Sequence, residues 1–349
     1  MGALRVTVAL FLHVLNAKNL IADQALASPG KYLMSLRIAL LDDYQTRAAA
    51  AADWSRLADA EMVAFDYHLG GPDDVVAALA DFDVVVAMRE RTALLSNVLT
   101  RLPRLKLLIT AGMRNLSIDM ECARERGVVV CGTSMLGYPA AELAWALVMS
   151  LTKRLPWEQQ AMHAGKWQTT LATGLKGKTM GLWGLGKLGQ RVARIAQAFE
   201  MDVISWSENL TAEVAAEHGV QRVDFETLMS TSDILSIHVI LGDRTRDKIG
   251  TAELATMKPS AYIVNTSRGP VINEAALVDA LQRNLIAGAG LDVFDVEPLP
   301  VDHVLRNLPN VALTGHTGYV TEELYGVVYG QALEAVEAWQ QDTPVRVLN

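Results

Sequence analysis

Six short apolar runs in the second half of the chain most constrain what this sequence can fold into. They begin with the segment MGLW near Thr179 and recur at intervals up to residue 315. The other five are Val203–Trp206, Ile234–Val239, Ala261–Thr266, Ala287–Phe294 and Val311–Gly315. Strands that are apolar on both sides are typical of a parallel sheet covered by helices on both faces. Stretches with helical spacing fill the gaps, so this half predicts an alternating α/β arrangement.

A similar series of apolar runs and helical stretches precedes this one in the first half of the chain. Its strand-like runs are Ile38–Leu41, Val84–Ala87, Leu105–Thr110 and Val128–Val130. Between and after them, helices are expected over Thr46–Ala60, Asp73–Ala80 and Ala140–Thr152, with a long closing helix at Glu322–Trp339. Two such series in 349 residues suggest two α/β domains with sizeable cores.

Composition narrows the function classes. The net charge of −8 argues against a nucleic-acid partner, which needs a basic face. Cys122 and Cys131 form no CxxC or metal-ligand cluster, so no metal site is predicted and a reducing, cytoplasmic location is expected.

The amino-terminal segment stands apart from both series. Val6–Leu15 is apolar but shorter than the ~20 residues that span a bilayer, and no membrane partner is expected. Met34 offers a second start directly before the Ile38–Leu41 strand, so residues 1–34 are expected to be an extension outside the fold. A secretion signal is the alternative.

A glycine-rich turn, GLGKLG, links one apolar run to a helical stretch. Gly184, Gly186 and Gly189 follow a strand-like segment and open a helix, with another strand at Val203–Trp206. In this context the first glycine permits a tight turn, the second lets the backbone approach a pyrophosphate, and the third lets helix and strand pack closely. The turn therefore predicts a dinucleotide site, with a plain strand–helix corner as the alternative.

The choice of dinucleotide depends on the end of the second strand. An acidic residue ~20 positions after the turn usually holds the ribose hydroxyls, and Ser207 stands there. Glu208 follows it, and no neighbouring arginine welcomes a 2′-phosphate. NAD is favoured, and NADP is not excluded.

Three later strand ends carry polar residues suited to hydride transfer. Arg268 lies in NTSRGP, Asp292 and Glu297 in GLDVFDVEP, and His316 in LTGHTGY. In an open α/β sheet the loops beyond the carboxyl ends of the strands line the ligand crevice, so these residues can converge. A guanidinium can bind a carboxylate and polarise the adjacent carbonyl. An imidazole can exchange a proton with the alkoxide, and a neighbouring carboxylate favours its protonated form.

Together these segments resemble the D-isomer-specific 2-hydroxyacid dehydrogenases, including D-3-phosphoglycerate dehydrogenases. The resemblance implies that Arg268 binds substrate, that His316 is the acid/base with Glu297 as its partner, and that Asp292 contacts the nicotinamide side of the cofactor. Further cofactor contacts are implied at Lys187, Leu188, Ser207, His238, Thr245, Thr266 and Gly318, besides the three glycines of the turn. Substrate contacts are implied at Arg89, Gly112 and Met113. Arg114 stands where the family usually has an acidic residue. It is either a second contact for the substrate anion or a surface residue.

The same resemblance implies the architecture. It consists of a Rossmann-type NAD-binding domain over residues 134–316 and a flavodoxin-like split substrate domain over residues 35–133 and 317–349. The active site is expected in an interdomain cleft, and Ala140–Thr152 matches a dimer-forming segment, so a homodimer is expected.

The expected activity is NAD-dependent interconversion of a small D-2-hydroxy acid and its 2-oxo acid. Formate dehydrogenases of the family carry glutamine where this chain has Glu297, which disfavours that reaction. The alternative function is a non-catalytic NAD(H)-sensing interaction protein, as in the corepressors that resemble these enzymes.

Overall fold

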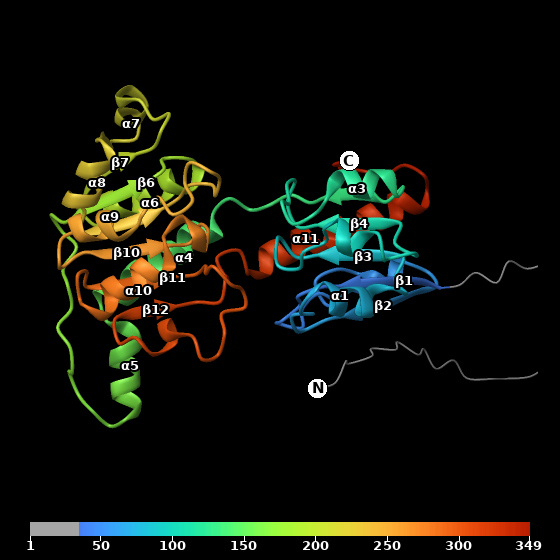
Figure 1. Ribbon diagram of the computed structural model, residues 1–349, viewed down its shortest axis with the longest axis horizontal. Helices are drawn as coiled ribbons and strands as arrows, with labels where there is room; N and C mark the ends of the chain where they lie inside the picture. Colours follow the sequence, from blue (N-terminus) through green and yellow to red (C-terminus); the bar gives the residue numbers. More distant parts are fainter. Residues whose placement is uncertain (1–34) are drawn as a thin grey trace, which may run out of the picture. The chain divides into compact units, whose positions relative to one another are not determined.

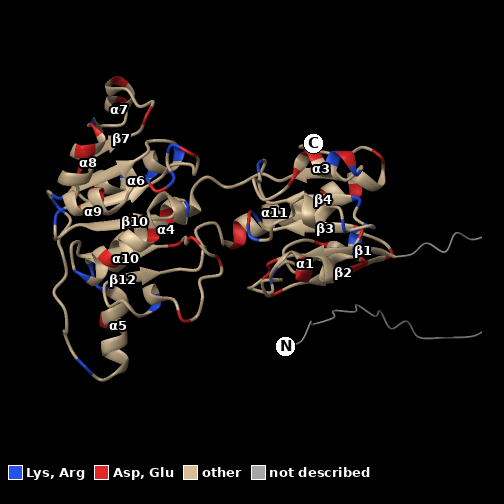
Figure 2. Cartoon of the chain, viewed as in Figure 1, with Lys and Arg blue, Asp and Glu red and all other residues tan. Residues whose placement is uncertain are grey.

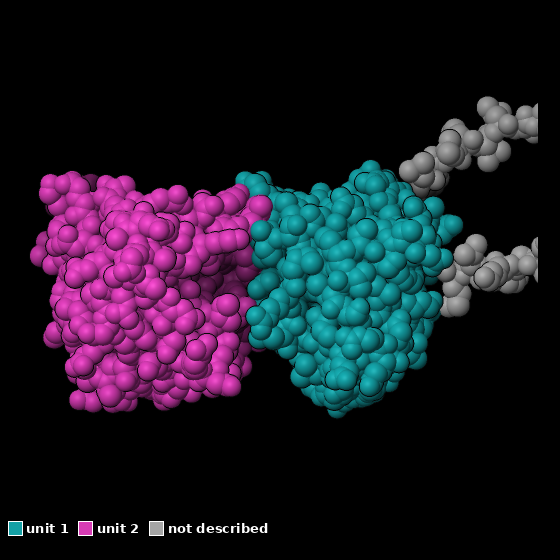
Figure 3. Space-filling model, turned by 90° about the horizontal axis from the view of Figure 1, so that it is seen from above, with its two compact units in different colours: residues 1–135, 322–349 teal, residues 136–321 magenta. Residues whose placement is uncertain are grey.

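The computed structural model describes residues 35–349, so the expected extension at residues 1–34 and its secretion-signal alternative lie outside the described part. The chain divides into two compact units, coloured separately in Figure 3. Unit 1 runs up to Met135 and resumes at Glu322–Asn349, and unit 2 is Leu136–Thr321. The domain limits expected from the sequence, after residues 133 and 316, stay a prediction.

Unit 1 is built on a five-stranded parallel sheet in the order β2-β1-β3-β4-β5 (Figure 1). This is the order of flavodoxin-like folds, with a switch point between β1 and β3. The strands are β1 (Leu36–Leu40), β2 (Ala60–Ala64), β3 (Val84–Ala87), β4 (Leu107–Thr110) and β5 (Val129–Gly132). The helices are α1 (Pro72–Leu79), α2 (Ser96–Leu99), α3 (Met120–Glu125) and α11 (Glu322–Gln340). The predicted fold class is confirmed for this unit.

The end of the chain completes unit 1. Helix α11 buries an apolar face that includes Leu324, Val328 and Leu333. The amide of Leu348 then donates to the carbonyl of Val130 at 2.8 Å, along the edge of β5. The expected long closing helix is therefore confirmed, and it packs in the unit that the first part of the chain forms.

One expected helix is wrong. Over residues 46–60 the structure has only a 3₁₀ turn, η1 (Trp54–Arg56), before β2 begins. The carboxylate of Asp43 accepts hydrogen bonds from the amides of Arg47 and Ala48 at 2.9 and 3.0 Å, and Thr46 has φ of 54°. These contacts hold the start of the segment in a turn, so they override the helix preference of its alanines.

Unit 2 is built on a seven-stranded parallel sheet in the order β12-β11-β10-β9-β6-β7-β8 (Figure 1). The order reverses between β6 and β9, as in dinucleotide-binding folds, and the Rossmann-type prediction is confirmed. The strands are β6 (Thr179–Trp183), β7 (Asp202–Trp206), β8 (Gln221–Arg222), β9 (Ile234–Ile237), β10 (Tyr262–Asn265), β11 (Gly288–Leu291) and β12 (Val311–Leu313).

Helices cover both faces of this sheet. One core contains Met180 and Leu182 of β6 with residues of α4 (Pro139–Thr152), α6 (Lys187–Ala198) and α7 (Ala212–Glu217). The other contains Trp183 with residues of α8 (Phe225–Thr231), α9 (Thr251–Thr256) and α10 (Glu274–Gln282). Successive side chains of a strand point alternately into these two cores, which explains why the strands are apolar on both sides. In contrast, α5 (Leu155–His163) has no buried residue.

Each unit fixes the amino ends of its central strands with a buried or half-buried aspartate. Asp83, just before β3, accepts from the amide of Arg37 in β1 and from the side chains of Arg104 and Lys106. Asp233, just before β9, accepts from the amide of Thr179 in β6 and from Lys258. Figure 2 shows that charged residues lie mainly on helices and loops, with the strands of both sheets largely uncharged. Among residues 35–349, no helix is long and apolar enough to cross a membrane.

Candidate active site

The glycine turn lies directly after β6, at the reversal point of the unit 2 sheet. Gly184 has φ of 100°, and a Cβ there would come within 2.7 Å of the carbonyl oxygen of His238. A Cβ on Gly189 would collide with the carbonyl of Gly184, whereas one on Gly186 would meet nothing within 4 Å. Gly186 also caps α6, whose first amides have no partner within the helix. Gly184 and Gly189 are closely packed, whereas the space beside Gly186 is open. This arrangement suits the binding of a pyrophosphate at the start of α6.

The predicted cofactor residues Lys187 and Leu188 open helix α6, and four others follow strands of unit 2. Ser207 follows β7, beside Trp206, whose ring packs on Phe225 with centroids 4.8 Å apart. His238 follows β9, and its Nε2 lies 2.9 Å from the hydroxyl of Ser236. Burial lowers the pKa of His238 to about 4. In the same loop the hydroxyl of Thr245 donates to the carbonyl of Ile240 at 2.7 Å. Thr266 directly follows β10.

The loop that carries Arg268 is held by its own polar residues. The side chain of the buried Asn265, at the end of β10, donates to the carbonyl of Arg268 at 2.9 Å and accepts from the amide of Ser267 at 3.0 Å. The hydroxyl of Ser267 donates to the carbonyl of Val239, and the guanidinium of Arg268 donates to the carbonyl of Ser267 at 2.7 Å. The loop thus ties the ends of β9 and β10 together.

Asp292 anchors the loop that carries His316. Its Oδ1 accepts from the hydroxyl of Thr314 at 2.6 Å and from the amide of Thr317 at 2.7 Å, and its Oδ2 accepts from the amide of Gly318 at 2.9 Å. The residue between them, His316, takes a left-handed backbone with φ of 54°. A carboxylate that receives several bonds from one loop fixes that loop's conformation, so Asp292 holds the backbone around the imidazole.

Glu297 and His316 form a hydrogen-bonded pair. Glu297 Oε2 lies 2.5 Å from His316 Nδ1, and Glu297 Oε1 accepts from the amide of Phe294 at 3.0 Å. Burial alone would raise the pKa of Glu297, but the hydrogen bond and charge of His316, the Phe294 amide and the charge of Arg268 lower it. The structure therefore brings Arg268, Glu297 and His316 together from the loops after β10, β11 and β12. Such a pair can hold and exchange a proton next to a bound anion.

The substrate contacts implied by the resemblance lie in unit 1, after β3 and β4. Arg89 has φ of 56°, donates to the carbonyl of Ala111 at 3.2 Å and pairs with Glu90 at 3.5 Å. A Cβ on Gly112 would overlap the Arg89 guanidinium, so these two loops pack tightly. Met113 is 53% exposed, and Arg114 is exposed as well.

Asn265, Thr314 and Thr317 also belong to the site, although no role for them is predicted from the sequence. The Asn265 turn has a local signal, because an Asn side chain often bonds the amide two residues ahead. The two threonines have none, because their contact with Asp292 depends on the pairing of β11 and β12.

Comparison with known proteins identifies the family. Residues 145–318 match the family described as "D-isomer specific 2-hydroxyacid dehydrogenase, NAD binding domain". A glyoxylate reductase of Thermococcus litoralis is 39% identical over 236 residues, which cover 65% of this chain and 71% of the relative. The chain belongs to the D-isomer specific 2-hydroxyacid dehydrogenase family. It is an NAD-dependent D-2-hydroxyacid dehydrogenase, as its sequence predicts.

Other similar proteins carry different substrate names. A hydroxypyruvate reductase of Thermotoga maritima is 36% identical to this dehydrogenase over 257 residues, covering 72% of this chain and 82% of the relative. A crystal structure of a phosphoglycerate oxidoreductase from Vibrio cholerae has a TM-score of 0.84 at 33% identity, covering 88% of this chain and 99% of the other. The chain is about equally identical to proteins named for three different substrates. The comparisons therefore do not identify the substrate of this dehydrogenase, which must be inferred from the residues of its site.

Proposed function

We propose that this dehydrogenase interconverts a small D-2-hydroxy acid and its 2-oxo acid, with Arg268, Glu297 and His316 as its catalytic residues. The observation that carries the proposal is the 2.5 Å pairing of His316 Nδ1 with Glu297 Oε2, in a place where the charge of Arg268 also acts on Glu297. Reduction of a 2-oxo acid requires a cation that binds the carboxylate and an imidazole orientated to protonate the carbonyl oxygen, and Arg268 and His316 can supply these groups.

When bound, NADH would supply the hydride that the carbonyl carbon accepts in the direction of reduction. Arg268 binds the substrate carboxylate and polarises the adjacent carbonyl. The imidazolium of His316 donates its Nε2 proton to the carbonyl oxygen as that oxygen gains the electron pair of the C=O π bond. Glu297 accepts the Nδ1–H throughout, so it fixes the ring and stabilises its charged form. In oxidation the same imidazole takes the hydroxyl proton.

The residues around the glycine turn fit NAD. We propose that unit 2 is the cofactor domain and that Ser207 faces the adenosine ribose. The cofactor contacts of this proposal are Gly184, Gly186, Lys187, Leu188, Gly189, Ser207, His238, Thr245, Thr266, Asp292 and Gly318. Unit 1 is then the substrate domain, and Arg89, Gly112 and Met113, which follow its strands β3 and β4, are its substrate contacts.

A homodimer is part of the proposal. The segment expected to form the dimer, Ala140–Thr152, lies in α4, where Leu147, Val148 and Leu151 are buried in the core of unit 2, so the contact is proposed at a neighbouring helix. Helix α5, at the lower end of unit 2 in Figure 1, and the segment after it expose apolar side chains, with Leu155 and Met162 each 51% and Trp167 75% exposed. A large exposed apolar patch marks an interaction surface. A second copy of the chain is the proposed occupant, and sedimentation of Trp167→Glu against wild type tests it: the variant should sediment as a monomer. A cytoplasmic location stays a prediction.

The catalytic proposal is tested by oxidation of NADH with glyoxylate, hydroxypyruvate, 3-phosphohydroxypyruvate and bulkier 2-oxo acids. Arg268→Ala should lower kcat/KM about 100-fold or more, because it removes a charged partner of the substrate carboxylate. Arg283→Ala, which removes an exposed arginine paired with Asp279 on α10, is the matched control and should leave kcat/KM unchanged. NADH binding without turnover of any acid, or equal activity of the two variants, would contradict the proposal.

A further inference from the structure

A second histidine–carboxylate pair lies in unit 2, beside the residues of the catalytic proposal. His303 Nε2 is 3.1 Å from Oε1 of Glu274, which opens helix α10. Both side chains are largely buried, with 22% and 24% of their surface exposed. The proposed mechanism uses neither residue.

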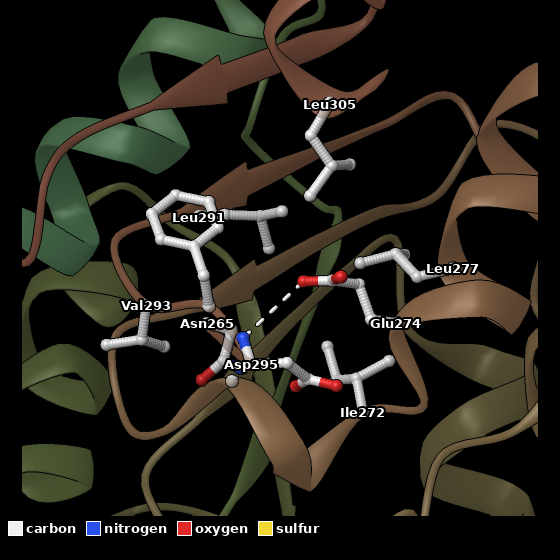
Figure 4. Close-up of a pocket in the computed structure, with 10 residues that line it drawn as sticks. Asn265, Ile272, Glu274, Leu277, Leu291, Val293, Asp295 and Leu305 are labelled. Atoms are coloured by element: carbon white, nitrogen blue, oxygen red, sulfur yellow. Dashed lines mark hydrogen bonds between the residues drawn. The ribbon is translucent and has the colours of Figure 1, made fainter. Parts of the chain in front are cut away.

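The hydrogen bonds of His303 define its tautomer. Its Nδ1 accepts from the amide of Leu305 at 3.3 Å, so the proton of the neutral ring is on Nε2, which donates to Glu274. The other oxygen of Glu274 accepts from the amide of Asp295 at 3.4 Å, the dashed line in Figure 4. Glu274, Asp295 and Leu305 line a small pocket there. The pair therefore holds the backbone at Asp295 from one side.

That backbone positions the proposed catalytic carboxylate. Asp295 follows Phe294, whose amide binds Glu297 Oε1, while Glu297 Oε2 binds His316. A Cβ on Gly269 would overlap the same backbone of Phe294 and Asp295, so the loop of Arg268 packs directly on it. A shift at residues 294–295 would therefore move Glu297 relative to both Arg268 and His316.

We propose that Glu274 and His303 are positioning residues for the reaction: by holding the amide of Asp295 they keep Glu297 aligned with the imidazole of His316. The inference rests on the proposed function, because it assumes that Glu297 and His316 form the acid/base pair. The titratable and charged groups that face Asp295 are Glu274, Asp247, Arg246 and His303, so Glu274 is one of several such groups there. The geometric role of Glu274 must therefore be separated from its charge.

The test compares Glu274→Ala with Asp279→Ala, which removes an exposed carboxylate from the same helix. We expect Glu274→Ala to lower kcat for reduction of the best 2-oxo acid about 10-fold, since small misplacements of reacting groups are costly. The KM for NADH should stay within about twofold of wild type, because the glycine turn is untouched. Glu274→Gln keeps the shape but loses one acceptor, so it should show a smaller loss in kcat and serves if the alanine variant does not fold.

The pH profile separates positioning from a loss of folded enzyme. Glu297→Gln sets the reference: without the carboxylate the imidazolium is less favoured, so the alkaline limb of reduction should move to lower pH. Glu274→Ala and Glu274→Gln should move it in the same direction by a smaller amount, and Asp279→Ala should not move it. A wild-type profile in both Glu274 variants would overturn the inference while the proposed function stands. If Glu297→Gln itself leaves kcat and the profile unchanged, the proposed function fails and the inference with it.

Discussion

His238 makes the stability of unit 2 depend on pH. The residue follows β9 and packs against the glycine turn: a Cβ on Gly189 would lie 3.8 Å from its ring, and its carbonyl blocks a Cβ on Gly184. Burial lowers the pKa of His238 from an ordinary value of 6.5 to about 4. The folded protein therefore keeps this imidazole neutral at pH values where the unfolded chain protonates it.

The sign and size of the effect follow from this difference. Between pH 6.5 and about 4 the unfolded state binds more protons than the folded state, so stability falls as the pH is lowered through this window. One pKa unit corresponds to ~1.4 kcal/mol, so the whole difference is worth about 3 kcal/mol, of which about 2 kcal/mol is lost between pH 7 and pH 4.5. His238 as a whole residue is only partly buried, and its contact with solvent reduces the loss below these values.

Urea unfolding at pH 7 and pH 4.5, followed by tryptophan fluorescence, measures this loss in wild type and in His238→Gln. The glutamine keeps a polar group near Ser236 but does not titrate. Wild type should lose up to about 2 kcal/mol more than the variant between the two pH values. Equal losses would show that the neutral imidazole is not stabilised by burial, and would refute the reasoning.

Three further predictions concern other parts of the fold. Gly189→Ala should lower the thermal stability of the cofactor-free protein by about 1–3 kcal/mol, because its Cβ would overlap the Gly184 carbonyl. Gly186→Ala should cost less in the same calorimetric scan, because its Cβ meets no atom within 4 Å and the change affects only the N-cap of α6. Ser207→Asp should raise the preference for NADH over NADPH about tenfold in kcat/KM, because a carboxylate accepts bonds from ribose hydroxyls and repels a 2′-phosphate; an unchanged ratio would place Ser207 away from the ribose. Asp83→Ala should cost about 2–3 kcal/mol in urea unfolding at pH 7, because it leaves the Arg37 amide and the half-buried Arg104 without their acceptor. The pKa of Asp83 is lowered, since its hydrogen bonds and neighbouring cations outweigh burial, so this contribution is present above pH 3.8 and is lost as the pH falls below it.

Local sequence signals predicted the elements that position the site. The apolar runs of unit 2 became strands, and the spacing of the three glycines matches the turn between β6 and α6, because both signals depend on a few adjacent residues. The order of the strands was available only through the family resemblance. The helix expected at residues 46–60 failed because Asp43 redirects the chain through bonds to two amides that no periodicity records.

The residues that hold the site residues in place could not be predicted from local sequence signals. Glu274 and His303 lie 29 positions apart in the sequence, and their contact depends on where α10 and the loop after β11 meet. The same holds for Asp292 and Thr317, which are joined only because β11 and β12 are neighbours. The polar residues at strand ends were visible in the sequence, but their hydrogen-bond partners follow from the tertiary fold.

The aspartates that fix the amino ends of the central strands have a genetic consequence. Asp83 and Asp233 occupy matching places in the two sheets. Asp83 binds the amino end of β1 and Asp233 binds the amino end of β6, whereas Arg89 and Arg268 follow the carboxyl ends of strands in the same sheets. Alleles that replace either aspartate should therefore reduce the amount of enzyme in the cell and leave each surviving molecule with normal turnover. Growth at lower temperature or extra gene copies should rescue such alleles, whereas neither should rescue a change at Arg268, the residue proposed to bind the substrate carboxylate. Under the proposed function, defects in abundance and defects in chemistry therefore map to opposite ends of the parallel strands.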